Sequence, residues 1–378
     1  MAKLGEVCLI NPKSCTLRDD TEVSFIPMTK VGEHGEFDAS EIKNYSEVKK
    51  GFTNFQNGDI LFAKITPCME NGKGAIAHNM KNGIGFGSTE FHVLRPDTDK
   101  ITSEWLYYLT TWKTFRKEAE RNMTGSAGQK RVPKTFLENY VVNLPDIDTQ
   151  KSENKILRKV DDLIFLRKQQ LAKLDELVKA RFVEMFLLHD YPTKTLDELS
   201  IGKGEYGAQS ASTEYDSTRP RYIRITDVNE DGTLNDDKVS SENITDDEQY
   251  RLSYGDFMFA RMGATVGKTY AFLSGNQIFA GYLIRYKLNL SLANPRYLFW
   301  YTKLDDYQKW VKLNQSGAAQ PGINAKKYGS LKIPVPPIAL QNQFAAFVER
   351  VERQKQTVQQ SLEKLELMKK ALMQEYFG

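Results

Sequence analysis

The stretch Gln150-Lys-Ser-Glu-Asn-Lys-Ile-Leu-Arg-Lys-Val160 opens a segment that the chain contains twice. It predicts a long helix that runs to about Leu188. A single shift in residue number, without any gap, aligns Gln150 with Gln341 and Phe186 with Phe377. Because a chance match rarely holds register over such a length, we interpret the C-terminal segment as a second copy of this helix.

Both copies carry an apolar residue at every seventh position, the period of helices that pack on helices. These positions are Leu157, Ile164, Leu171 and Val178 in the first copy and Val351, Val358, Leu365 and Leu372 in the second. Two amphipathic helices that each need a partner are predicted to pair with each other. At about 1.5 Å per residue, about 36 residues form a rod of roughly 50 Å.

Composition indicates ordinary globular material, because 40% of the 378 residues are hydrophobic and 27% are charged. This length suggests two or three domains. The 52 basic residues nearly cancel the 49 acidic ones, so the net charge of +3 by itself points to no class of partner. The odd number of cysteines, Cys8, Cys15 and Cys68, argues against a disulfide framework and for a reducing compartment. Without a membrane-length apolar run or a signal-peptide core, the sequence predicts a cytoplasmic protein.

The duplication continues upstream of each helix. Gly58-Asp-Ile-Leu-Phe-Ala-Lys64 corresponds to Gly255-Asp-Phe-Met-Phe-Ala-Arg261, each a Gly-Asp turn leading into a short apolar strand that ends in a cation. A small-residue loop also recurs, at Thr124–Gln129 and at Gln315–Gln320. Short strands and turns mixed with one or two helices indicate an α+β fold for each globular part.

The predicted organisation alternates globular parts with helices, at residues 1–150, 151–190, 191–341 and 342–378. We expect the two helices to pair as an antiparallel coiled coil, which would give the chain an internal two-fold pseudo-symmetry. A parallel pair would need a connection that returns along the whole rod. The second globular part is long enough to make that return, so the antiparallel arrangement is a preference.

Motifs for catalysis are weak throughout the chain. Gly263-Ala-Thr-Val-Gly-Lys-Thr269 is one residue short of the spacing of a phosphate-binding loop, so we favour a basic glycine loop. Pro145-Asp146 with Glu153-Asn-Lys155 looks like a nuclease metal-binding set, but a charged helix start explains it at least as well. No Asn/Asp-Pro-Pro-aromatic tetrapeptide for adenine methylation occurs. The histidines are scattered along the chain, and the cysteines lack the close paired spacing of metal ligands. The sequence therefore predicts no catalytic residue, metal ligand or cofactor ligand.

Recognition is the function class that this pattern favours, and the candidate residues are cations and amides close to glycine and aromatic residues. Lys and Arg in loops can hold phosphates, while Gln, Asn and Arg can read base edges. The candidates are Lys64, Lys73, Gln129, Lys130, Arg131 and Lys134 in the first half and Arg224, Arg261, Lys268, Gln320 and Lys326 in the second. Each alone is more often a solvated surface residue, but their recurrence at equivalent positions favours nucleic-acid binding.

The whole pattern resembles the specificity subunit of type I restriction-modification enzymes. The resemblance rests on the two Gly-Asp runs, on the loop from Gln315 to Asn324 and on Ile333-Pro-Val-Pro-Pro-Ile-Ala-Leu-Gln341. Lys130 departs from it, because the second copy has Pro321 there. The resemblance implies a non-catalytic subunit that reads a bipartite double-stranded DNA sequence through the major groove, one half with each recognition domain, and it adds Asn324 to the DNA-binding set.

The resemblance also implies protein partners. The paired helices would set the gap between the half-sites, since a rod of roughly 50 Å spans between one and two turns of B-DNA at about 34–36 Å per turn. Their apolar positions would also dock modification (methyltransferase) subunits. These would supply S-adenosylmethionine, and restriction (translocase and endonuclease) subunits would add ATP and Mg²⁺ chemistry, so that this chain itself holds no cofactor.

Two other hypotheses belong to different function classes. The first is a two-headed coiled-coil scaffold that joins protein partners, with loops that bind no DNA sequence. Steep loss of binding with rising salt would favour DNA over the scaffold, because phosphate contacts release counterions. The second is a self-contained nuclease, which would have to cleave DNA with a metal ion and without partners.

Overall fold

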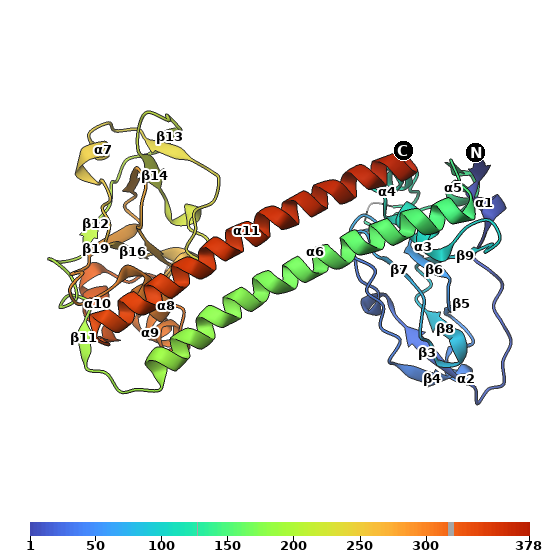
Figure 1. The fold of residues 1–378 in the computed structure, drawn as a ribbon, viewed down its shortest axis with the longest axis horizontal. Coiled ribbons are helices and arrows are strands. Elements are labelled where there is room, and N and C mark those ends of the chain that lie inside the picture. The colour runs from blue at the N-terminus through green and yellow to red at the C-terminus, as the bar shows by residue number, and fades with distance from the viewer. Residues whose placement is uncertain (127, 317–320) are drawn as a thin grey trace. The chain divides into compact units, whose positions relative to one another are not determined.

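The computed structural model describes residues 1–126, 128–316 and 321–378, which form two compact units. Unit 1 comprises Met1–Lys168 and Gln360–Gly378, and unit 2 comprises Gln169–Gln359. Each unit contains one globular domain and one part of each long helix, α6 (Ile147–Phe182) and α11 (Ile338–Phe377) (Figure 1). The α+β fold class predicted for each half is confirmed.

The long helices begin at Ile147 and Ile338, before the predicted positions 151 and 342. The reason is local capping. Asp146 stops the helix at its N-terminus, because its Oδ1 accepts the backbone N–H of Thr149 at 2.8 Å. Pro337 stands at the equivalent position before α11, where a residue without an N–H group suits a helix start. At its other end, α6 passes into the π-helical turn η3 (Val183–Leu187).

The two helices run antiparallel within unit 1. The Lys369 ammonium lies 2.6 Å from the Asp161 carboxylate, and the Lys168 ammonium lies 3.8 Å from the Glu366 carboxylate. As the residue number rises along α6, that of the partner residue on α11 falls. Because these pairs are half-exposed, they mark the register more than they stabilise the helices.

The same direction holds within unit 2. Lys355 contacts Asp175 at 2.6 Å, and the rings of Phe182 and Phe344 lie 5.3 Å apart. The antiparallel pairing that we preferred is therefore confirmed in each unit. Along the seam, Leu157, Val178, Val351 and Val358 are buried, while Ile164, Leu171, Leu365 and Leu372 are half-buried.

Short strands and helices make up the globular domain of unit 1. They are β1 (Ala2–Lys3), α1 (Leu4–Val7), β2 (Cys8–Ile10), β3 (Glu22–Ile26), η1 (Met28–Lys30), β4 (Ile42–Asn44), α2 (Tyr45–Val48), β5 (Thr53–Gln56), β6 (Ile60–Ala63), β7 (Gly74–Ile76), η2 (Lys81–Gly83), β8 (Ile84–Gly87), β9 (Phe91–Pro96), α3 (Ser103–Thr111), α4 (Lys113–Arg121), α5 (Lys134–Asn139) and β10 (Val141–Val142).

Unit 2 has a corresponding series. It consists of β11 (Thr193–Thr195), β12 (Glu205–Tyr206), β13 (Ser212–Glu214), β14 (Arg221–Ile223), η4 (Ile225–Asp227), β15 (Val239–Ser241), α7 (Asp246–Gln249), β16 (Asp256–Ala260), η5 (Gly263–Thr265), β17 (Thr269–Ala271), β18 (Gln277–Phe279), β19 (Leu283–Lys287), α8 (Pro295–Tyr301), α9 (Asp305–Asn314), α10 (Ala325–Gly329) and β20 (Lys332–Pro334).

Strand order shows that both units are built on one plan. The sheet β2-β9-β6-β7 of unit 1 matches the sheet β12-β19-β16-β17 of unit 2. A parallel pair, β3 with β8 or β14 with β18, lies beside it in each unit. Antiparallel β1 and β10, like β11 and β20, join the start of each domain to its end. The duplication seen in the sequence is therefore a duplication of topology.

The Gly-Asp turn places the central strand of each large sheet. Gly58 and Gly255 have φ of 92° and 97°, a left-handed conformation that favours glycine. The carboxylate that follows closes the turn: Asp59 accepts the N–H of Gln56, and Asp256 accepts the N–H of Ser253, both at 2.8 Å. The strands that follow, β6 and β16, are buried along their whole length.

Membrane spans and metal-ligand clusters were searched for in the described parts of the chain. There, no helix is long and apolar enough to cross a bilayer. Over the same residues, no group of three or more His, Cys, Asp and Glu side chains is arranged to hold a metal ion.

Candidate nucleic-acid interface

Each unit brings the residue after its central strand against the small-residue loop. In unit 1 the carbonyl of Lys64 accepts the N–H of Val132 at 2.9 Å, and Arg131 bridges to both Ile65 and Thr124. The predicted residues Lys64, Lys130 and Arg131 are thereby gathered on one surface. Gln129 lies in the same loop and is exposed.

Unit 2 repeats this arrangement. The carbonyl of Arg261 accepts the N–H of Ile323 at 2.9 Å, and Gly322 bridges to Met262. Asn324 follows as the N-cap of α10, where its Oδ1 accepts the N–H of Lys327 at 2.9 Å. Lys326 is exposed on the first turn of α10. Gln320 lies outside the described residues.

Several predicted cations are neutralised by carboxylates of their own unit. Arg131 pairs with Glu90 at 2.8 Å, and this guanidinium is the main reason why the pKa of Glu90 lies below its usual range. The other pairs are Lys134 with Glu138 at 3.0 Å, Arg224 with Asp227 at 2.7 Å and with Asp237 at 2.6 Å, and Lys268 with Glu230 at 2.9 Å. A DNA phosphate would have to compete with these carboxylates.

Two lysines also have a structural role that their spacing did not suggest. Lys73 donates to the carbonyl of Met28 at 3.2 Å, and Lys268 donates to the carbonyl of Val228 at 3.0 Å. Both carbonyls lie in or directly after the short helical turns η1 and η4. These ammonium groups therefore stabilise corresponding turns in the two units, which is a simple reason for their recurrence.

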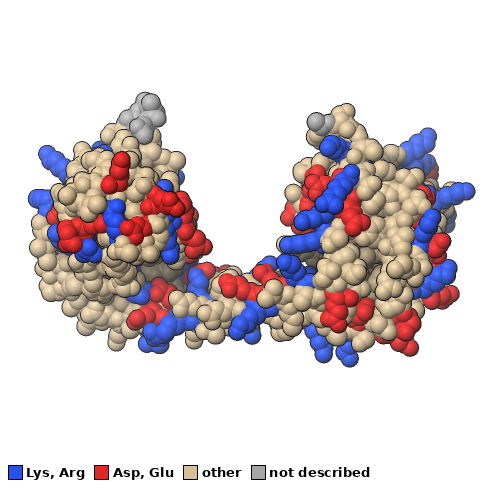
Figure 2. Space-filling model, turned by 90° about the horizontal axis from the view of Figure 1, so that it is seen from above, with Lys and Arg blue, Asp and Glu red and all other residues tan. Residues whose placement is uncertain are grey.

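Lys64, Lys130, Arg261 and Lys326 form the remaining set, which we call the free cations. Within the described residues, none of the four has a carboxylate within ion-pair distance. Figure 2 shows Lys and Arg interleaved with Asp and Glu on the visible face, without a single broad basic patch. Because the charges are mixed, the visible face has no broad positive field that would attract DNA. Cations that lack an internal carboxylate partner are therefore the strongest candidates for phosphate or base contacts.

Arg261 has the most distinctive surroundings of the free cations. Its guanidinium lies 4.9 Å from the ring centroid of Tyr206 and 5.9 Å from that of Tyr282. Its Nε is buried and finds no acceptor in the part of the chain that the structure describes. Both tyrosines remain open to solvent, with 41% and 53% of their surface exposed. Aromatic rings therefore hold a planar cation at the surface without neutralising it.

The sequence interpretation missed Tyr206, Tyr282 and the nearby exposed Gln209. Gln209 belongs to this surface because a Cβ on Gly281 would meet its side chain. One signal was available for Tyr282. The N–H of Arg261 bonds to the Tyr282 carbonyl at 3.0 Å, just as the N–H of Lys64 bonds to the Glu90 carbonyl at 2.9 Å.

The two units therefore carry different side chains at equivalent backbone positions. Unit 1 places the Glu90 carboxylate, paired with Arg131, where unit 2 places the Tyr282 ring. Lys64 in unit 1 corresponds to Arg261 in unit 2. The two surfaces share a backbone scaffold and differ in the hydrogen-bonding groups that they present. They therefore suit two ligands of the same class whose surfaces differ in detail.

The nuclease-like residues have structural partners instead. Asp146 caps α6, and Glu153 accepts the indole N–H of Trp105 at 2.8 Å. Burial raises the pKa of Glu153. The ionised carboxylate that a metal ion would bind is therefore less favoured. The phosphate-loop-like stretch forms the short turn η5, followed by Gly267 with a φ of 86°.

Known proteins are similar to this chain in sequence and in fold. Residues 1–176 and 189–367 match the family model described as the type I restriction modification DNA specificity domain. The specificity subunit of the type I restriction enzyme EcoAI from Escherichia coli is 46% identical over 178 residues, which are 46% of this chain and 30% of that protein. The EcoEI specificity subunit from the same species is 38% identical over 204 residues, 52% of this chain and 33% of that protein. The chain thus matches about a third of the length of these relatives.

A solved structure extends the similarity to the fold. The S subunit of the type I restriction-modification system from M. genitalium covers 100% of this chain and 95% of its own, with a TM-score of 0.62. The sequences are only 13% identical, so this likeness concerns the fold alone.

Proposed function

The chain belongs to the type I restriction modification DNA specificity domain family, and from this premise we propose that it selects the DNA target of a methyltransferase complex. Each unit reads one half of a bipartite sequence in double-stranded DNA. The chain catalyses nothing itself and works in the cytoplasm. Modification subunits bind to it and supply S-adenosylmethionine, and restriction subunits join them with ATP and Mg²⁺.

One observation supports DNA reading above all. The free cations, Lys64 and Lys130 in unit 1 and Arg261 and Lys326 in unit 2, lie beside corresponding loops of two domains with the same topology. A duplicated surface that keeps its scaffold and changes its side chains suits two half-sites of different sequence. Lysines would hold the backbone phosphates, and arginine, glutamine and tyrosine would contact base edges.

The helices support the second part of the proposal, which is partner docking. Their pairing seam leaves several large apolar side chains exposed, namely Ile156, Leu163, Phe165, Leu166, Leu177, Leu367 and Met368. Phe165 and Leu367 expose 60% and 67% of their surface. Exposed apolar stripes on a helix pair are typical of a surface that another protein covers.

Methylation mapping tests the function directly. Cells that carry this chain with its modification partner would be sequenced for methylated bases, and again after residues 1–150 are exchanged for another recognition domain. We expect a two-part motif of which one half changes and the other stays. A motif that is lost as a whole, or a genome without a two-part mark although the methyltransferase is active, would contradict the proposal.

A further inference from the structure

His92 is a buried imidazole in the large sheet of unit 1. It lies on β9, where it exposes only 4% of its surface. A neutral imidazole has one donor and one acceptor nitrogen, and both are engaged here. Nε2 lies 2.8 Å from the carbonyl oxygen of Val132, and Nδ1 lies 2.9 Å from the amide nitrogen of Asn11. His92 therefore joins the sheet to the loop that carries predicted DNA contacts.

The neighbouring amide fixes which nitrogen of His92 carries the proton. Oδ1 of Asn11 accepts the N–H of Val93 at 3.0 Å, and the backbone N–H of Asn11 bonds to the Val93 carbonyl at 2.7 Å. This orientation brings the amide NH2 group to Nδ1 of His92, while Oδ1 lies farther away, at 3.4 Å. Because Nδ1 accepts from Asn11, Nε2 holds the proton and donates to the Val132 carbonyl.

Val132 ends the loop that holds the predicted cations Lys130 and Arg131. It exposes only 1% of its surface, so its two backbone polar groups need partners within the protein. Its N–H bonds to the carbonyl of Lys64 at 2.9 Å, and its carbonyl accepts from His92. The imidazole therefore fixes one end of the loop, two residues from the free cation Lys130.

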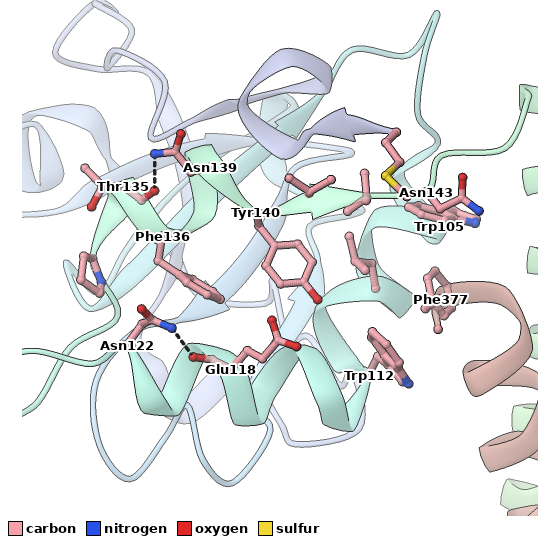
Figure 3. A pocket seen from close by; sticks show the side chains of 16 residues that line it. Trp105, Trp112, Glu118, Asn122, Thr135, Phe136, Asn139, Tyr140, Asn143 and Phe377 are labelled. Atoms are coloured by element: carbon pink, nitrogen blue, oxygen red, sulfur yellow. Dashed lines mark hydrogen bonds between the residues drawn. The ribbon is translucent and has the colours of Figure 1, made fainter.

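Packing of α5 fixes the chain on the other side of Val132. The rings of Phe136 and Tyr140 lie 5.9 and 4.7 Å from the ring of Phe115 on α4. Figure 3 shows Phe136 and Tyr140 pointing toward α4. Because apolar packing holds α5 in place, the direction in which residues 128–131 approach it depends on how Val132 is held. His92 supplies a hydrogen bond at that point.

The surroundings of His92 favour its neutral form. Burial lowers the pKa of His92 below its usual value of 6.5, and the ammonium groups of Lys64 and Lys134 lower it further. The hydrogen bond to Val132 and the carboxylate of Glu90 act in the opposite direction, but the net shift is downward. Lys64, Lys134 and Glu90, from the ends of β6, α5 and β9, are the charged side chains that act on the ring.

Protonation would disturb this arrangement. A proton on Nδ1 would face the NH2 group of Asn11, donor against donor, and the new charge would lie in a buried site near two lysines. Because the pKa is lowered in the folded state, the unfolded chain binds a proton more readily. The contribution of His92 to stability is therefore fully present above its usual pKa of 6.5, and it is lost as the pH falls below that value.

Unit 2 has an apolar residue at the corresponding place. Ile284 pairs with Phe259 as His92 pairs with Phe62. Both phenylalanines are the fifth residue of a Gly-Asp run, so Ile284 and His92 are equivalent. An isoleucine side chain has neither a donor nor a titratable group. Unit 2 therefore has no contact at this position that responds to a proton, and the two units provide an internal comparison.

We propose that His92 is a positioning residue for unit 1, whose neutral imidazole holds residues 128–132 in the conformation that reads one half of the DNA target. Replacing the imidazole, or adding a proton to it, should weaken the reading of that half alone. The proposal rests on the proposed function, because it assigns DNA reading to this loop. His92 itself is buried and acts through Val132.

Discrimination by the methylating complex measures this role. The full chain with its modification partner would methylate a duplex with the mapped two-part motif and two duplexes with one base pair changed in either half. The ratio of rates on matched and changed duplexes reports the reading of each half, and it cancels the pH dependence of methyl transfer. Between about pH 7.5 and 5.5, the ratio for the unit 1 half should fall about fivefold to tenfold, as expected for one lost hydrogen bond. The ratio for the unit 2 half should stay constant.

Three variants separate positioning from packing. His92→Gln keeps a donor for the Val132 carbonyl but does not titrate, so it should retain discrimination and remove its pH dependence. His92→Ile installs the residue of unit 2 and should lower discrimination of the unit 1 half about tenfold at every pH. Val93→Ala is the control, because Val93 and Val132 belong to different apolar cores. It should cost stability without changing discrimination.

Hydrogen exchange in the full chain gives a readout that does not involve DNA. At one pH, amides of residues 128–132 should exchange faster in His92→Ile than in the unmodified chain, whereas those of unit 2 should not change. Unchanged exchange there, equal pH profiles for the unmodified chain and His92→Gln, or equal losses in both half-sites would overturn the proposal. If His92→Ile does not fold, the profile of His92→Gln decides. A genome without a two-part motif would contradict the proposed function, and exchange would still decide whether His92 holds the loop.

Discussion

At the scale of single residues, the internal partner of a cation decides what it can do. Arg224 and Arg261 are both arginines near glycine and aromatic residues, and sequence alone ranked them equally. The guanidinium of Arg224 is held by Asp227 and Asp237, which raise its pKa. Arg261 lies between two tyrosine rings that hold it without cancelling its charge. Arg261 is therefore the arginine that we expect to contact DNA.

Arg261→Ala should weaken DNA binding through unit 2 by about tenfold or more, the value of a bidentate contact between arginine and a base. Arg261→Lys separates two roles, since lysine keeps the charge but loses the planar fork. If Arg261 reads a base, the lysine variant should relax the methylation motif at one position of one half-site. A uniform loss of affinity for all sequences would instead mark a phosphate contact. Lys309→Ala, on the exposed surface of α9, serves as the control.

The two equivalent buried aspartates should differ in their contribution to stability. Asp59 accepts two hydrogen bonds from Arg95 at 2.8 Å each, whereas Asp256 lies 3.5 Å from Arg285. Burial also raises the pKa of Asp256, so its charged form is less favoured. Asp59→Asn should therefore cost more free energy of unfolding than Asp256→Asn. We expect about 2–3 kcal/mol, below the value for a fully buried pair because Arg95 keeps contact with water. Equal losses in chemical denaturation would contradict this account.

At the scale of elements, one glutamine joins the start of each long helix to its domain. Buried Gln150 accepts the N–H of Thr102 at 2.9 Å and donates to the carbonyls of Lys100 and Pro145, both at 2.9 Å. Gln341 repeats this pattern: it accepts the N–H of Asn294 at 2.9 Å and donates to two carbonyls, at 3.0 Å and 2.8 Å. Thr102 and Asn294 are the N-caps of α3 and α8. In each unit, these hydrogen bonds therefore join the first turns of the long helix to the domain and help to fix its direction there.

Gln150→Ala should lower the free energy of unfolding by about 2–3 kcal/mol, because it removes the partner of one donor and two acceptors in a partly buried site. Gln150→Glu is the sharper variant, since it keeps the size of the side chain but cannot donate to the two carbonyls. We expect it to be at least as destabilising near neutral pH. Gln169→Ala on the exposed part of α6 is the control. A loss no larger than that of the control would contradict the role of Gln150.

At the scale of the whole molecule, the chain contains the same fold twice, and the two copies differ in their surface residues. The two sheets share their strand order, but unit 1 has Glu90 and Glu118 where unit 2 has Tyr282 and Trp310. The cores preserve apolar character because packing requires it, whereas exposed positions are free to differ. Such divergence permits two half-sites of unequal sequence.

Salt dependence tests DNA reading for the molecule as a whole. If Lys64, Lys130, Arg261 and Lys326 each neutralise a phosphate, affinity should fall about 100-fold between about 50 and 200 mM monovalent salt. Filter binding or anisotropy with a duplex that contains the mapped motif would measure this slope. Alanine at Lys64 and Lys130 together should make the slope shallower. Binding that is tight and insensitive to salt would favour the protein scaffold.

The sequence by itself determined the repeat, the antiparallel pairing preference and the position of the central strands. Heptad spacing and Gly-Asp turns are local signals, since helix period and left-handed backbone depend on neighbouring residues. The choice among the candidate cations was decided only by tertiary structure. Glu90 lies 41 positions before Arg131 in the chain, and Tyr206 lies 55 positions before Arg261, so no spacing rule connects them.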